Sequence, residues 1–85
     1  MIDTLMAVDI DDKVSFETQN GRRFTAEVRD TWHAGLPMTR ENRIGLLLER
    51  PAYGSIQLKD GKLYHYVHGC PGANDEILSI ERVAK

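Results

Sequence analysis

Cysteine and long apolar runs are both scarce in this sequence, and each scarcity excludes a class of protein. One cysteine in 85 residues cannot form an intramolecular disulfide, so stability has to come from packing, a metal or a second subunit. The chain's apolar runs, such as residues 46–48, are far short of the roughly 20 residues that a membrane-spanning helix needs. The N-terminus shows no charged-then-apolar leader. We therefore expect a protein of the reducing cytoplasm that is not embedded in a membrane.

A strong excess of charge is also missing. The formal net charge is −2, which argues against a strong general affinity for nucleic acid. Residues 1–17 carry five acidic residues against a single lysine. Six of the seven arginines lie in the middle: Arg22, Arg23, Arg29, Arg40, Arg43 and Arg50. Acidic neighbours partly offset them, so a solvated charged face is the first interpretation and a basic contact surface the second.

The chain is long enough for one modest core. Residues 1–85 fit a single domain, which by surface-to-volume scaling buries only about 60–65% of the surface of its unfolded form. Leu, Ile, Val and Phe supply about a quarter of the residues, above the roughly one-fifth below which disorder is expected. We therefore expect one small folded domain.

Residues 54–66 carry the clearest structural signal, a β-hairpin. Asp60-Gly61 lies at its centre, and this dipeptide accepts the positive φ of a tight two-residue turn. The second strand of this hairpin ends beside a dense group of reactive side chains within residues 64–70. We expect strands on both sides of the turn.

Residues 12–29 form a second expected hairpin, and its apolar rows select the turn. A two-residue loop at Asn20-Gly21 would place the two apolar rows on opposite faces of the sheet. A three-residue loop instead pairs Phe16 with Phe24. We therefore predict a type I turn closed by Gly21 in the left-handed region.

The rest of the chain is less regular. Residues 1–11 fit neither period, so a short helix and an extended lead-in both stay open. Residues 31–42 contain Gly35 and Pro37 without a sustained period and are expected to be a long loop. Residues 43–49 alternate as a central strand that ends before Pro51. Residues 75–84 suit either a short helix or a closing strand, and the strand is favoured because it removes an open sheet edge.

Five or six short strands with tight glycine turns predict an all-β, mainly antiparallel fold: a small barrel or strongly bent sheet, with room for a short helix at a terminus. The stretch from Ile10 to Phe16, an acidic turn leading into an alternating strand, resembles the first strand of many SH3-like small barrels. The resemblance implies a fold class and no functional residue.

Metal binding and catalysis are weaker hypotheses. His33, His68 and Cys70 are the candidate metal ligands, because imidazole and thiolate suit zinc. His65 and His68 are an odd number apart, so on a continuous strand they face opposite sides. Cys70 beside His68 lacks a recognisable third residue and an oxyanion hole. We expect no enzyme activity, metal or cofactor.

Aromatic side chains give the stronger functional signal. Tyr64 and Tyr66 share one strand face, which lies either outside as a contact surface or inside with Ile56 and Leu58. Trp32 is either a core plug or a ligand platform.

Our first hypothesis is a non-enzymatic interaction module that contacts another protein or itself through loop 31–42 and the aromatic hairpin face. The expected binding residues are Trp32, Met38, Arg40, Arg43, Tyr64 and Tyr66. The alternative is a nucleic-acid-binding barrel that uses the arginines of residues 22–50 with aromatic stacking.

Overall fold

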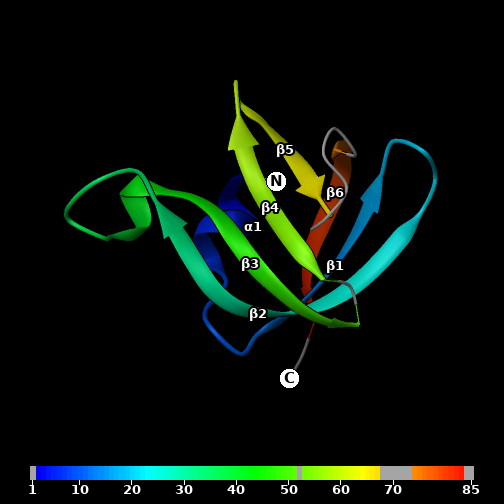
Figure 1. Cartoon of the computed structure of the whole chain (residues 1–85), viewed down its shortest axis with the longest axis horizontal. Helices are drawn as coiled ribbons and strands as arrows, with labels where there is room; N and C mark the ends of the chain where they lie inside the picture. The colour runs from blue at the N-terminus through cyan, green and yellow to red at the C-terminus, as the bar shows by residue number, and fades with distance from the viewer. Residues whose placement is uncertain (1, 52, 68–73, 84–85) are drawn as a thin grey trace.

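Six antiparallel strands form a closed barrel with one short helix at the N-terminus (Figure 1). The structure is a computed structural model, and it describes residues 2–51, 53–67 and 74–83. Each strand pairs with its neighbours in chain order, and β6 returns to pair with β1. The all-β prediction is confirmed. The elements are α1 Ile2–Ala7, β1 Lys13–Thr18, β2 Arg23–His33, the 3₁₀ helix η1 Arg40–Asn42, β3 Arg43–Pro51, β4 Gly54–Lys59, β5 Lys62–Tyr66 and β6 Asn74–Val83.

The hairpin of β1 and β2 has the predicted register and turn. Phe16 pairs with Phe24, and their rings stack with centroids 5.4 Å apart. Gly21 has a φ of 81° and its amide donates to the Thr18 carbonyl, as a three-residue loop requires. Alternation and the turn glycine together therefore determined this register.

The hairpin of β4 and β5 is confirmed as well. Lys59 pairs with Lys62, so Asp60 and Gly61 alone form the loop. Their φ angles are 52° and 79°, and positive values at both positions are typical of a type I′ turn.

The C-terminal segment is the closing strand, β6, and a bulge explains why its pattern also suited a helix. Glu17 pairs with Ser79 but Thr18 pairs with Ile77, which leaves Leu78 as an extra residue. The bulge lets Ile77 and Ile80 both face the interior, although their spacing of three is typical of one helix face. Because β6 pairs with β1 and β5, it removes both open edges.

Helix α1 covers the barrel interior with its apolar side. Leu5 from α1 and Val8 just after it are completely buried and join the core. The lead-in is thus helical over its first part. The other core residues are Val14, Phe16, Ala26, Val28, Leu46, Leu48, Ile56, Leu63, Ile77 and Ile80.

The expected long loop is shorter than predicted. Strand β2 continues to His33 and η1 begins at Arg40, so only residues 34–39 lack regular structure. The prediction of a loop over residues 31–42 was wrong at both ends. A register shift between Val28 and Asp30 interrupts the alternation of apolar and polar residues, so the sequence pattern does not indicate that β2 continues. Among the described residues, no helix is long and apolar enough to cross a membrane.

Candidate functional site

The end of β2 and the start of β3 form an arm, defined here as residues 29–45, whose loop projects from one side of the barrel (Figure 1). A bulge starts the arm. Val28 pairs with Leu48 and Asp30 pairs with Leu47, so Arg29 is an extra residue. The extra residue reverses which side chains face outward. Trp32 has the same parity as the buried Val28, yet it lies outside.

Large apolar side chains are exposed along this arm. Trp32 is 44% exposed, Leu36 86%, Met38 66% and Ile44 36%. Trp32 is therefore not a core plug. Simple alternation would place Ile44 on the same face as the buried Leu46. Ile44 is instead the extra residue of a second bulge, because Trp32 pairs with Gly45 and His33 with Arg43. No pattern in the sequence marks this exposure of Ile44.

The second bulge turns Arg43 towards helix α1. Arg43 is 6% exposed, and its Nη1 donates to the carbonyl oxygens of Leu5, Met6 and Val8 at 2.9, 3.3 and 2.7 Å. These bonds satisfy carbonyls at the end of the helix. Burial lowers the pKa of Arg43, and the nearby charge of Arg40 lowers this pKa further. The prediction that Arg43 is a surface binding residue is therefore corrected. The buried Arg43 side chain links α1 to β3 through its hydrogen bonds.

Two polar atoms on this inner side of the arm are buried without a hydrogen-bond partner. They are Nε of Arg43 and Nδ1 of His33, and these two residues are cross-strand partners. His33 is half-buried. Its two proposed metal co-ligands, His68 and Cys70, lie outside the described residues. The described residues hold no group of three or more His, Cys, Asp or Glu side chains suited to a metal ion.

Several arginines of the middle segment face carboxylates. Arg40 donates to Asp9 at 2.7 Å, and Arg23 bridges Glu81 at 2.9 Å and Glu17 at 3.5 Å. All these side chains lie near solvent, where such pairs contribute roughly 0–1 kcal/mol each. The arginines therefore form a mixed-charge surface, and one of them is buried against α1.

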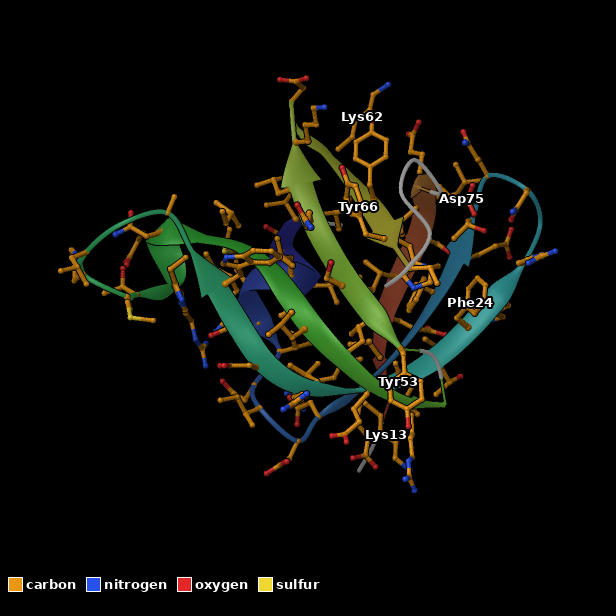
Figure 2. All side chains as sticks on the ribbon, in the orientation of Figure 1. Lys13, Phe24, Tyr53, Lys62, Tyr66 and Asp75 are labelled. Carbon is orange, nitrogen blue, oxygen red and sulfur yellow. The ribbon has the colours of Figure 1, made fainter. Side chains whose placement is uncertain are left out.

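Tyr64 and Tyr66 point outward from β5, as one of the two alternatives predicted. Both are half-buried, whereas Leu63 and His65 between and beside them face the interior. Their cross-strand partners on β4 are Gln57 and Ser55. Figure 2 shows Tyr66 lying over the neighbouring strand β4.

One row of the outer surface links the arm to the tyrosines. Trp32 pairs with Gly45, Gly45 with Gln57 and Gln57 with Tyr64. Three strand spacings put Trp32 and Tyr64 about 14 Å apart along this row. At Gly45 a Cβ would lie 2.5 Å from the Ile56 carbonyl oxygen, so the row has no side chain at that point. The predicted aromatic residues thus share one face without touching across it.

His65 is a buried ionisable side chain of the barrel interior. Its residue is 3% exposed, and its ring lies 4.9 Å from the Phe16 ring and 5.1 Å from the Phe24 ring. Nε2 lies 3.3 Å from the Tyr53 carbonyl oxygen. Burial lowers the pKa of His65, while the Tyr53 hydrogen bond and the charge of Asp75 oppose that effect. His65 is therefore a neutral core residue near neutral pH.

No protein-family model, no curated protein and no solved structure matches this chain.

Proposed function

We propose that the protein is a non-enzymatic interaction module, an SH3-like barrel of the cytoplasm, which binds another protein or a second copy of itself through the arm. One observation carries this proposal: four large apolar side chains, Trp32, Leu36, Met38 and Ile44, are exposed together on one projecting arm. Exposed apolar side chains that gather on one segment are typical of contact sites when they form a common surface.

The tyrosine face extends the proposed surface. Trp32 and Tyr64 lie on one outer row, and Tyr66 lies beside Tyr64 on the same face of β5. Aromatic side chains are enriched where proteins bind each other, because they bury large area with few rotatable bonds. The arm supplies the apolar anchor and the tyrosines supply amphipathic contacts next to it.

The nucleic-acid alternative has less support. It needs arginines that are free to contact phosphate, but Arg23 and Arg40 contact carboxylates and Arg43 is buried. A polarisation assay with single- and double-stranded DNA and RNA at low salt tests it. Binding that weakens steeply with ionic strength would favour this alternative, because phosphate contacts release counterions.

Affinity capture with matched variants tests the interaction module. The test variant is the double substitution Leu36→Ser and Met38→Ser, and the control is Leu78→Ser, which removes an exposed leucine on β6 outside the arm. We expect proteins captured from the cells that express this chain, or self-association by light scattering, to fall at least tenfold for the arm variant and to persist for the control. Equal capture and equal self-association by all three proteins would contradict the proposal.

A further inference from the structure

The second half of β2 has a strand edge that no described residue covers. Strand β1 pairs with β2 only as far as Glu27, and Asp11 and Asp12 extend that pairing to Val28. Beyond this point, within the described part of the chain, residues 29–33 pair only with β3. This short segment therefore offers unpaired backbone groups to another strand.

Two residues direct their backbone groups to this edge. Ala34 donates its amide to Asn42 next to β3, so the alternation along a strand points the amides of His33 and Thr31 away from β3. The Thr31 amide accordingly donates to Oδ1 of Asp30 at 2.8 Å rather than to a strand.

We propose that this edge pairs antiparallel with the same edge of a second copy of the chain, with Trp32 on the two-fold axis. The inference rests on the proposed function, because it names the protein that the arm contacts. In this register Thr31 of one copy opposes His33 of the other. Each such pair exchanges two backbone hydrogen bonds, and the symmetry produces two pairs.

Side-chain chemistry selects this register over its neighbour. Centring the pairing on Asp30 would oppose two carboxylates, which is unfavourable. Centring it on Trp32 places two exposed indole rings side by side in a close, non-hydrogen-bonded pair. It also moves Asp30 opposite Ala34 of the second copy, away from the other Asp30.

The same register closes the free edge of both copies at once. Each copy offers the same residues 29–33 to the other, and the two Trp32 side chains meet at the axis. This self-complementarity favours a second copy over an unrelated strand.

Two exposed polar interactions must open for the strands to pair. The Asp30 carboxylate occupies the Thr31 amide, and the ion pair of Arg40 and Asp9 links the loop after β2 to the turn before β1. Both interactions lie at the surface, where they contribute little to stability. Both interactions compete with pairing of the edge. Asp30→Ala frees the Thr31 amide and should therefore strengthen dimer formation.

Cysteine cross-linking tests the proposed axis. In a Cys70→Ser background, Trp32→Cys would place the two Cα atoms about 4.5 Å apart across the axis, within the roughly 4.4–6.8 Å range of disulfides. The control is Glu27→Cys, an exposed position on β2 that pairs with Lys13 of β1 on one side and Glu49 of β3 on the other. We expect mild oxidation to link most of the Trp32→Cys protein and little of the control. Equal linking of the two variants would overturn the proposed axis.

Sedimentation of untagged protein gives a second test that does not remove Trp32. His33→Pro deletes an amide that points away from β3, so the barrel keeps its ladder while the intermolecular donor is lost. We expect a dimer for the parent protein, at least tenfold weaker association for His33→Pro with an unchanged circular dichroism spectrum, and tighter association for Asp30→Ala. A parent protein that stays monomeric in sedimentation would overturn the second-copy inference. If the Leu36→Ser, Met38→Ser variant nevertheless captures less of a partner protein than the parent does, the proposed function stands. If the variant captures as much as the parent, both proposals are overturned.

Discussion

Over residues 23–28, β2 pairs along its whole length with β1 and its lead-in, and from Ala26 onward it also pairs with β3; its apolar side chains face inward and its charged or polar ones outward. Over residues 29–33, the same strand has β3 on one side only and turns Trp32 to solvent. A single bulged residue, Arg29, separates the two halves. The difference shows how one inserted residue lets a barrel strand continue as an arm that extends beyond the core. The first half is built for stability and the second half for contact.

Truncating one aromatic residue in each half of β2 tests most strongly whether the two halves contribute differently to stability. Phe24 packs on Phe16 and His65, so Phe24→Ala should lower the free energy of unfolding by about 3 kcal/mol. Trp32→Ala removes a side chain that is exposed and should cost less than about 1 kcal/mol. Urea unfolding of both variants measures this. Equal losses would show that the arm belongs to the cooperative core.

The two arginines at the base of the arm provide the next contrast. Arg43→Met leaves carbonyls at the end of α1 without their donor, and we expect a loss of about 2 kcal/mol. Arg40→Met breaks only an exposed ion pair with Asp9 and should change stability by less than about 1 kcal/mol. Thermal unfolding followed by circular dichroism separates the two outcomes. If Arg43→Met is neutral, the helix is not held by this side chain.

Turn glycines near the two ends of β2 give a smaller contrast. Gly21 and Gly35 have φ angles of 81° and 87°, and at both positions a Cβ has open space, so a β-branched residue adds backbone strain without a clash. Gly21→Val should cost about 1–2 kcal/mol, because the tight turn fixes the register of β1 and β2. Gly35→Val should cost less, because residues 34–39 lie outside the barrel and can adjust. An unchanged thermal midpoint for Gly21→Val would contradict the turn assignment.

The regular half of β2 was predictable and the irregular half was not, for a physical reason. In the first half, alternation and the turn at Gly21 point to one register, because only that register buries Phe16 and Phe24 together. In the second half, the position of a bulge depends on how the whole barrel twists and closes, which no local pattern encodes.

The same limit explains the site residues. Exposed Leu36 and Met38 could be anticipated from an irregular loop, whereas exposed Ile44 and buried Arg43 both follow from one bulge in β3. The outward direction of Tyr64 and Tyr66 followed from parity, but parity alone left the choice of face open. In the closed barrel Leu63 and His65 fill the interior, so Tyr64 and Tyr66 face outward.

The smallest expected effect is on the pH dependence of the unfolding free energy. It comes from His65 of β5, which contacts Phe24 in the first half of β2. The pKa of His65 lies below its usual value of about 6.5 because of burial, so between these two pKa values the unfolded chain binds a proton that the folded chain does not. Stability is therefore complete above about pH 6.5 and falls as the pH drops towards the folded-state pKa. Urea unfolding at pH 7.5 and 5.5 should show this fall, and His65→Leu should reduce it, since the other histidines remain. The ring and hydrogen-bond contacts of His65 among the described residues are with Phe16, Phe24 and Tyr53, outside the arm. Dimer affinity measured in parallel should therefore respond to His65→Leu far less than the unfolding free energy does. A His65→Leu variant that keeps the parent's pH dependence of unfolding would show that His65 is not its source.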